Sequence, residues 1–308
     1  MTTRPTAVPT AFDVDDIEDD APTPEPAWTR RRTPRPPALA QWRPGVAIGA
    51  LVVVLLALAA CRPDLFSSID PNRAVISETL QGPSGRHWFG TDQNGRDIYS
   101  RVVHGARLSL LIGLGASALA LVVGSLVGIL AASTGRVVGA VVDRVLDSVL
   151  SIPGLLMVLL VIAVLGTGTR NSVIGLALVT VPGYARVVRG EVIRIRGSVY
   201  LEAAHALGWS RFQVLRRHLV PNALGPVSVL ATIGVGSAIS TGSSLSFLGL
   251  GPQPPAAEWG AMLSTSRTYF AVAWWPAVFP GLAITLTVLA VTVTGQYLQL
   301  RVEGRNTR

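Results

Sequence analysis

The stretch LSLLIGLGASALALVVGSLVGILAA, residues 108–132, contains no charged side chain. An α-helix needs about 20 predominantly apolar residues to cross the hydrocarbon core of a bilayer, and this run exceeds that length. Glycine, alanine and serine recur along it, and small residues of this kind allow membrane helices to approach one another closely. The stretch therefore predicts a membrane-spanning helix that packs tightly against other helices.

Five further apolar runs are expected to span the membrane, at residues 45–61, 145–165, 173–188, 227–250 and 276–298. The composition agrees with this interpretation, because 49% of the residues are hydrophobic and only 14% are charged. Pro153 and Pro182 fall inside two of the runs, where neighbouring helices can satisfy the carbonyls that a proline frees. We expect an all-α integral membrane protein with about six transmembrane helices.

The distribution of arginines and of polar segments suggests a division of the chain. Arginines are more frequent on the side that holds both termini, which predicts a multi-pass plasma membrane protein with a cytoplasmic N-terminus and C-terminus. The expected segments are a disordered cytoplasmic tail (1–44), a first transmembrane helix (45–61), an extracytoplasmic loop with an interfacial helix (62–107), a core of five transmembrane helices (108–298) and a cytoplasmic C-terminus (299–308). The tail joins an acidic run to a basic, proline-rich run and offers little apolar surface to bury.

The basic residues and the single cysteine exclude several classes of function. All 26 basic residues are arginine, whereas a nucleotide-binding G-x-x-x-x-G-K-[ST] loop requires lysine. Cys61 alone forms neither an internal disulfide nor a multi-cysteine metal site. The sequence LAAC that ends at Cys61 resembles a lipoprotein cleavage box, but the long acidic segment before it is unlike a secretory signal.

The four histidines, His87, His104, His205 and His218, match no metal-ligand spacing. No triad of Ser, His and Asp is found on the apolar runs either, so a membrane-embedded hydrolase is weakly supported. We expect no metal, no cofactor and no catalytic activity in this chain.

The polar stretch YLEAAHALGWSRFQVLRRHLVPNAL, residues 200–224, separates two apolar runs and is too polar to cross lipid. Gly208 is expected to end a first short helix, since glycine adopts the left-handed conformation at helix C-termini. Ser210 and Gln213 have the spacing of a capping box for a second helix. An amphipathic hairpin lying on the inner leaflet is the alternative interpretation, because basic amphipathic helices commonly bind membrane surfaces.

The order Glu-Ala-Ala, three residues, Gly and a later Pro in this stretch resembles the EAA loop of permease subunits in ATP-binding-cassette (ABC) importers. Three longer segments resemble the dipeptide/oligopeptide/nickel branch of that family: GTDQNGRDIYSRVVHGARLSLLIG (90–113), GYARVVRGEVIRIRGSVYLEAAHALGWSRFQVLRRHLVPNALGP (183–226) and LSFLGLGPQPPAAEWGAML (245–263). The similarity covers about residues 85–297 and is closer to the second, C-type, of the two permeases that such importers pair.

The resemblance implies a type I ABC importer permease fold and a cytoplasmic coupling loop at 189–222. It implies that Glu202, Ala203, Ala204 and Gly208 dock on an ATPase subunit, and that Pro221 sets the return of the chain into the membrane. It further implies, as partners, a homologous second permease subunit, two ATP-binding subunits and an extracytoplasmic substrate-binding protein. Membrane lipid surrounds such a complex, and no nucleic acid takes part.

The function that these expectations favour is that of a permease subunit importing di-/oligopeptides. Nickel, haem, glutathione or another small solute is the alternative substrate within the family. An ion-coupled secondary transporter is a second alternative, but it requires ionisable groups near the bilayer midplane. The runs offer only the cluster Asp143, Arg144 and Asp147 at one edge, where we expect Arg144 and Asp147 to pair along one helical turn.

The segment GTDQNGRD (90–97) is expected to form a turn followed by a helix that Asp97 caps. Many relatives carry a glutamate where this chain has Gly242, and the C-terminal sequence GQYLQLRVEGR departs from the acidic pattern usual in the family. Both departures leave the contacts of those positions open.

Overall fold

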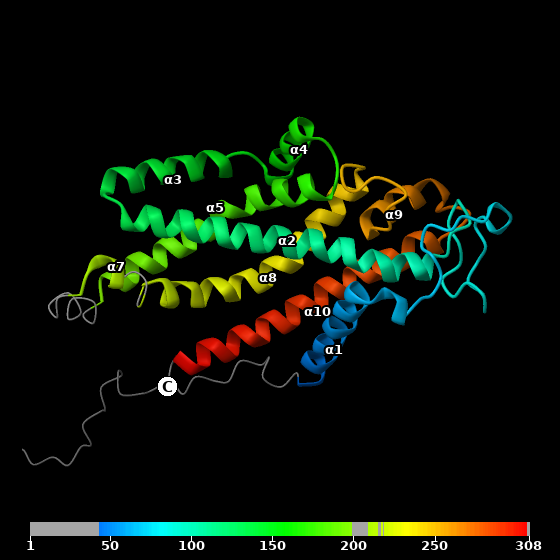
Figure 1. Cartoon of the computed structure of the whole chain (residues 1–308), viewed down its shortest axis with the longest axis horizontal. Helices are drawn as coiled ribbons and strands as arrows, with labels where there is room; N and C mark the ends of the chain where they lie inside the picture. The colour runs from blue at the N-terminus through cyan, green and yellow to red at the C-terminus, as the bar shows by residue number, and fades with distance from the viewer. Residues whose placement is uncertain (1–42, 199–208, 215–216, 218, 307–308) are drawn as a thin grey trace, which may run out of the picture. The chain divides into compact units, whose positions relative to one another are not determined.

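The computed structural model describes residues 43–198, 209–214, 217 and 219–306, all of which belong to one unit spanning Arg43–Arg308. Apart from one isolated bridge between Thr91 and Asp97 and a few short 3-10 turns, the regular structure of these residues is α-helical. The helices are α1 (Arg43–Cys61), α2 (Ile98–Ser133), α3 (Arg136–Leu150), α4 (Gly154–Leu165), α5 (Thr169–Arg196), α7 (Arg211–Val214), α8 (Val220–Phe247), α9 (Trp259–Ser266) and α10 (Trp275–Asn306) (Figure 1).

Within the described residues, four helices are long and apolar enough to cross a membrane: α1, α2, α5 and α10. The pair α3 and α4 counts as a fifth if its two parts form one span. Helix α8 includes residues 227–247 of the run expected at 227–250, and its 28 residues extend for about 42 Å at the usual rise per residue. The expectation of an all-α membrane protein is confirmed.

The third apolar run is not one continuous helix, contrary to our expectation for residues 145–165. Helix α3 ends at Leu150, α4 begins at Gly154, and the two helices meet at 90°. Pro153, at the N-cap of α4, explains the break. Proline has no N–H to donate to the preceding turn and disfavours helical backbone in the residue before it.

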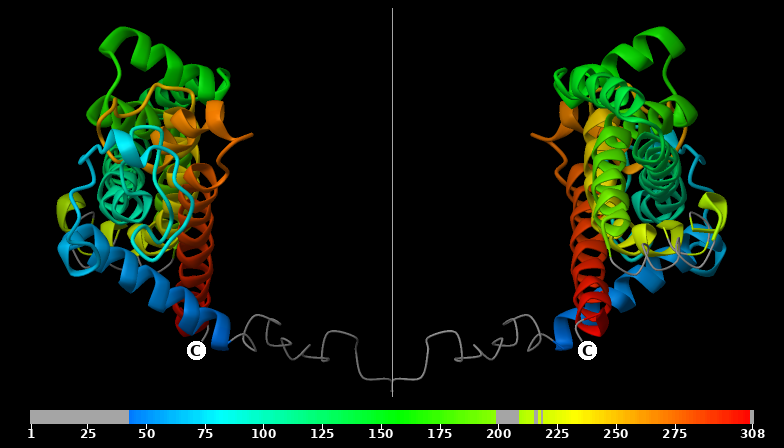
Figure 2. Two further views of the ribbon diagram at one scale, coloured as in Figure 1. Left: turned by 90° about the vertical axis from the view of Figure 1, so that its right-hand side faces the viewer. Right: turned by 90° about the vertical axis from the view of Figure 1, so that its left-hand side faces the viewer.

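Helix α2 is the central element of the bundle. It runs beside α5 along much of its length and also contacts α8, while α10 packs between α8 and α1. The side views place α3 and α4 on one side of this bundle and α1 and α10 on the other (Figure 2). The two ends of the bundle differ: α9 and the connection at 62–97 lie at one end, and α7 lies at the other (Figure 1). We call these the α9 end and the α7 end.

Glycines on α2 permit its close contact with α5. A Cβ added to Gly128 lies 2.5 Å from the carbonyl oxygen of Ala185 and 2.8 Å from Cβ of Val188. A Cβ added to Gly124 lies 2.7 Å from Cβ of Tyr184. Since real Cβ atoms do not approach other atoms this closely, the two backbones reach their observed separation only because both α2 positions lack a side chain.

The α2–α5 contact predicts opposite effects for two glycine-to-alanine substitutions. Gly128→Ala forces the helices apart and is expected to lower the free energy of unfolding by roughly 1–3 kcal/mol, the usual cost of overpacking. Gly183→Ala, on α5, is the matched control, because nothing lies within 4 Å of the added methyl group. Alanine is favoured over glycine in helices, so the control is expected to keep or raise the melting temperature of the purified protein in detergent. Equal melting temperatures for both variants would contradict the contact.

Candidate functional site

The middle of the expected coupling loop, residues 199–208, lies outside the described part of the chain. Glu202, Ala203, Ala204 and Gly208 all fall in this gap, so their roles stay predictions. Pro221 is the second residue of α8, which begins at Val220. A proline is well tolerated in the first turn of a helix, where its missing N–H has no intrahelical acceptor.

The second helix of the loop begins as the sequence predicts. The backbone N–H of Ser210 donates to Oε1 of Gln213 at 2.9 Å, and the N–H of Gln213 donates to Oγ of Ser210 at 3.3 Å. This reciprocal pair is a capping box, which satisfies two N–H groups at the start of a helix. The short helix α7 therefore has a defined beginning, two residues after the undescribed segment.

Apolar contacts fix this part of the loop to the bundle. Val214 and Leu219 are 3% and 5% exposed and belong to one buried cluster with Val188 and Val192 of α5. Trp209 packs against the same cluster. We call Trp209, Val214 and Leu219 the loop anchor. Val214 and Leu219 are therefore packed within the same cluster as side chains of α5.

A cation–π contact supports the loop anchor. The guanidinium carbon of Arg217 lies 5.6 Å from the centre of the Trp209 ring. Such contacts contribute about 0.5–1 kcal/mol at exposed sites. Together with the buried cluster, this contact fixes the orientation of the Trp209 ring at the α7 end.

Two ion pairs join α3 to α5 near the same end. The carboxylate of Asp147 pairs with Arg186, and that of Asp143 pairs with Arg189. The expectation that Arg144 pairs with Asp147 along α3 is therefore wrong: the partner of Asp147 lies on the neighbouring helix. Partly exposed pairs of this kind contribute about 0–1 kcal/mol each to the stability of a protein. Their main effect here is to fix the orientation of α3 relative to α5.

At the α9 end, the segment GTDQNGRD forms the expected turn and helix cap. The Oδ2 atom of Asp97 accepts from the backbone N–H of Ser100 at 2.7 Å, which caps α2. The Oδ1 atom of Asp97 lies 2.8 Å from Nδ1 of His87. Asp92 accepts the backbone N–H groups of Asn94 and Arg96 at 2.8 and 3.0 Å. These acidic residues therefore shape the backbone, which accounts for their spacing.

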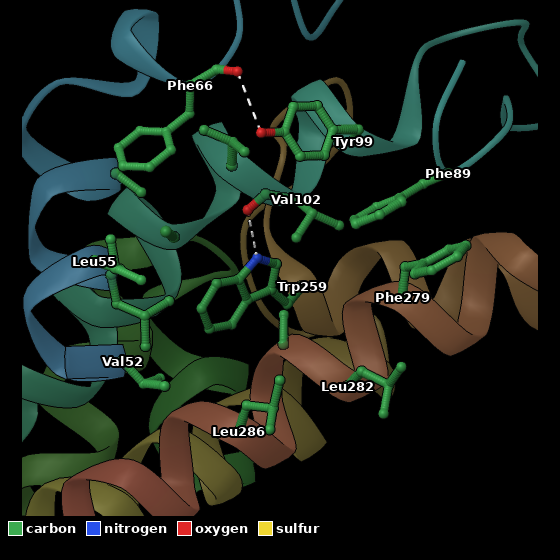
Figure 3. Close-up of a pocket in the computed structure, with 15 residues that line it drawn as sticks. Val52, Leu55, Phe66, Phe89, Tyr99, Val102, Trp259, Phe279, Leu282 and Leu286 are labelled. Carbon is green, nitrogen blue, oxygen red and sulfur yellow. Dashed lines mark hydrogen bonds between the residues drawn. The ribbon is translucent and has the colours of Figure 1, made fainter. Parts of the chain in front are cut away.

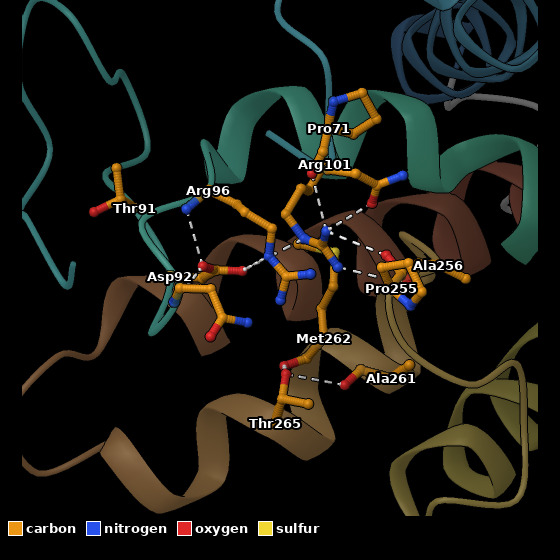
Figure 4. Close-up of polar contacts among 12 residues, drawn as sticks. Pro71, Thr91, Asp92, Arg96, Arg101, Pro255, Ala256, Ala261, Met262 and Thr265 are labelled. Atoms are coloured by element: carbon orange, nitrogen blue, oxygen red, sulfur yellow. Dashed lines mark hydrogen bonds and ion pairs between the residues drawn. The ribbon is translucent and has the colours of Figure 1, made fainter. Parts of the chain in front are cut away.

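Arg101 is a buried organising residue that the sequence analysis missed. It is 4% exposed and lies in the first turn of α2. Its Nη1 atom donates to the carbonyls of Pro71 and Pro255 at 3.0 and 3.4 Å, and Nη2 donates to the carbonyl of Ala256 at 3.5 Å (Figure 4). Its Nε atom lies 3.7 Å from Asp92 Oδ2. One guanidinium thus joins α2 to two loops, and a planar fork with five donors suits that task.

Glu258 is a second buried residue that fixes the α9 end. Its side chain caps α9 by accepting the N–H groups of Gly260 and Ala261 at 3.0 and 2.8 Å. It also accepts the hydroxyl of Ser109, on α2, at 3.1 Å. Trp259 adds a hydrogen bond from Nε1 to the carbonyl of Val102 at 2.8 Å. Short helix α9 is therefore held against α2 by hydrogen bonds from two adjacent residues.

Gly242 lies where α8 meets two other helices. A Cβ added there is 2.9 Å from Cγ2 of Ile112 on α2 and 3.3 Å from Cδ1 of Leu176 on α5. A charged side chain at this position would enter apolar surroundings and displace both neighbours, at a large desolvation cost. The glycine therefore fits the packing of this chain.

Comparison with known proteins identifies the family. Residues 101–308 match the family described as binding-protein-dependent transport system inner membrane component. The dipeptide transport system permease protein DppC of Alkalihalophilus pseudofirmus is 38% identical over 92% of this chain and 93% of that protein. The probable D,D-dipeptide transport system permease protein DdpC of Escherichia coli K12 is 38% identical over 80% and 83%. The glutathione transport system permease protein GsiD of Pectobacterium atrosepticum is 37% identical over 82% and 84%.

Solved structures support the fold alone. A chain of the MetNI methionine ABC transporter in an inward-facing conformation matches with a TM-score of 0.54 and 20% sequence identity. The match covers 66% of this chain and 96% of that chain. The described helices therefore share the fold of that transporter chain.

The contacts of Arg101 predict that lysine cannot replace it. Lysine presents a single ammonium group, which cannot reach carbonyls on two loops at once. Arg101→Lys is expected to lower the free energy of unfolding by roughly 2 kcal/mol, because buried carbonyls lose their donor. It should also make the connection at 62–97 more sensitive to proteolysis. Arg73→Lys, at an exposed position of the same connection, is the matched control and is expected to behave like the unmodified protein. Equal stability of the two variants would contradict the assignment of Arg101.

Proposed function

The chain belongs to the family of binding-protein-dependent transport system inner membrane components, and on this premise we propose that it forms half of the translocation pathway of an ATP-driven importer for di-/oligopeptides. It is a multi-pass membrane protein, and membership of the family implies ATP-binding subunits and a substrate-binding protein as partners. The second half of the pathway is a homologous permease subunit, and two ATP-binding subunits hydrolyse ATP for the complex.

The substrate class rests on the relatives. Their names refer to dipeptides, D,D-dipeptides and glutathione, which is itself a small peptide. The identity of 37–39% extends over at least 80% of this chain in each case. We therefore assign small peptides as the substrate class, with glutathione as the second candidate because it occurs among relatives of equal similarity.

Coupling to ATP hydrolysis runs through the loop at 189–222. In this proposal Glu202, Ala203, Ala204 and Gly208 dock on an ATP-binding subunit, and Pro221 starts the return into α8. The observation that carries the proposal is the loop anchor, because Val214 and Leu219 are buried in one cluster with side chains of α5 and Trp209 packs against it. A rigid connection of this kind converts movement of the ATP-binding subunits into rigid-body movement of the spans.

Orientation follows from the same assignment. The loop at 189–222, the tail (1–44) and the C-terminal segment (299–308) face the cytoplasm. The α9 end then faces outward, where the substrate-binding protein delivers the peptide. The excess of arginines near the loop and the termini supports this orientation through the positive-inside rule.

Substitutions in the docking residues test the coupling. Glu202→Lys and Gly208→Pro are expected to lower peptide-stimulated ATP hydrolysis by the assembled importer about tenfold or more, since truncating a central interface residue costs about 2 kcal/mol or more. Asp64→Lys is the matched charge-reversal control, because Asp64 lies in the connection at 62–97, outside the loop, and its side chain is 88% exposed. Co-purification of all subunits verifies that each variant still assembles. Unchanged stimulated hydrolysis in both docking variants would refute the coupling role.

Growth tests the substrate class separately. A strain that lacks this chain and carries the remaining importer genes is supplied with a dipeptide or tripeptide as its sole source of a required amino acid. We expect growth to depend on restoring the chain, and the same culture with glutathione as the sole sulfur source distinguishes the second candidate. Normal growth on peptides without the chain would contradict the peptide assignment and leave the coupling result unaffected.

A further inference from the structure

A cavity of about 440 Å³ lies between α1, α2 and α10 (Figure 3). Its wall is formed by side chains such as Val52 and Leu55 of α1, Val102 of α2, and Phe279 and Leu282 of α10. The cavity lies beside the α9 end of these helices, because Trp259 of α9 forms part of its wall. Its size is within the range of small-molecule binding sites.

The few polar atoms around the cavity are already occupied. The hydroxyl of Tyr99 donates to the carbonyl of Phe66 at 3.2 Å, and Nε1 of Trp259 donates to the carbonyl of Val102 at 2.8 Å (Figure 3). A polar ligand such as a peptide would find no hydrogen-bond partner here and would lose its hydration. The wall therefore selects a hydrocarbon ligand.

The cavity is continuous with the surface that these spanning helices present to lipid. Leu55 of α1 and Leu282 and Leu286 of α10 line it, yet they are 43%, 49% and 53% exposed. The helices α1 and α10 are both long and apolar enough to span the membrane. In a bilayer, the hydrocarbon available at such a surface is the acyl chain of a lipid.

Arg62 supplies a positive charge close in sequence to residues that line the cavity. Arg62 directly follows the last residue of α1, is exposed, and has cavity residues on both sides of it in sequence, Ala59 and Phe66. Within the described residues Arg62 forms no recorded ion pair, and the nearby Asp64 approaches only His104, at 4.0 Å. The arginine guanidinium presents five donors in a planar fork that matches the oxygens of a phosphate, such as that of a lipid headgroup.

Aromatic side chains mark the same level of the bundle. The ring of Trp88 lies 5.0 Å from that of Tyr99, which lines the cavity, and Trp88 is 63% exposed. Exposed tryptophan and tyrosine are typical of the membrane–water interface, where lipid headgroups lie. The apolar cavity thus begins at the depth of the headgroups and extends into the hydrocarbon layer.

We propose that this cavity is a phospholipid site, with one acyl chain between α1, α2 and α10 and the phosphate at Arg62. The bound chain fills space that no side chain fills and holds α1 against the rest of the bundle. This site is separate from the peptide pathway and from the coupling loop.

Photolabelling tests the site in the assembled importer. The complex is reconstituted in nanodiscs containing a phosphatidylethanolamine with a diazirine at the end of one acyl chain, and labelled residues are located by mass spectrometry. We expect labels on α1 and α10 residues that line the cavity. Ala283→Phe fills the cavity and is expected to reduce these labels several-fold. Ala57→Phe adds the same side chain to an exposed α1 position outside the cavity wall and is expected to leave them unchanged.

A second substitution tests the contact between Arg62 and the lipid phosphate. Arg62→Gln is expected to lower labelling a few-fold when the lipid is limiting, while the labelled positions stay the same, because the acyl chain still fits the cavity. Equal labelling of the unmodified chain and Ala283→Phe would overturn the proposal.

A photoreactive amino acid in place of Val103, a cavity residue of α2 that is 9% exposed, provides a second test that does not depend on filling the cavity. Coupling to lipid supports the site, whereas coupling to the second permease subunit in its place would show that protein occupies the cavity and would refute the proposal. ATP hydrolysis and co-purification of the subunits verify that each variant assembles.

Discussion

The close approach of α2 and α5 is the constraint on which the rest of the structure depends. Backbone atoms of the two helices meet at Gly124 and Gly128, where no side chain separates them. Several other elements pack on this pair: α8 contacts both helices, α3 pairs with α5, and α9 is hydrogen-bonded to α2. In a membrane, where lipid is as apolar as the side chains, such close packing supplies much of the association between helices.

The two ends of the α2–α5 pair are fixed by different interactions. At the α9 end, Arg101 and Glu258 hold two loops and a short helix through buried hydrogen bonds. At the α7 end, the loop anchor is apolar, and Arg196 at the end of α5 donates to the carbonyl of Ala132 on α2. Buried polar contacts are directional and apolar packing is not. The geometry of the α9 end is therefore fixed by directional contacts, whereas apolar packing contributes more at the α7 end.

The sequence predicts local features well and long-range partners poorly. The Asp97 cap and the Ser210–Gln213 capping box were predictable, because their donors and acceptors lie three residues apart. The helix break at Pro153 was not, since neighbouring helices decide whether a proline is accommodated. The acceptors of Arg101 lie up to 155 residues away and are backbone carbonyls, which carry no signal in the sequence. The family resemblance, by contrast, predicted the fold class correctly because its motifs span most of the chain.

The most direct measurement of the central claim is cysteine cross-linking at the coupling loop. In a Cys61→Ser background, Ala204→Cys is combined with single cysteines placed across the surface of the ATP-binding subunit and oxidised in membranes. The account predicts a disulfide between the two subunits, and protection of Ala204→Cys from a membrane-impermeant maleimide added outside intact cells. Modification from outside, or the absence of a cross-link to the ATP-binding subunit, would contradict the account, because the loop would then not contact the ATP-binding subunit.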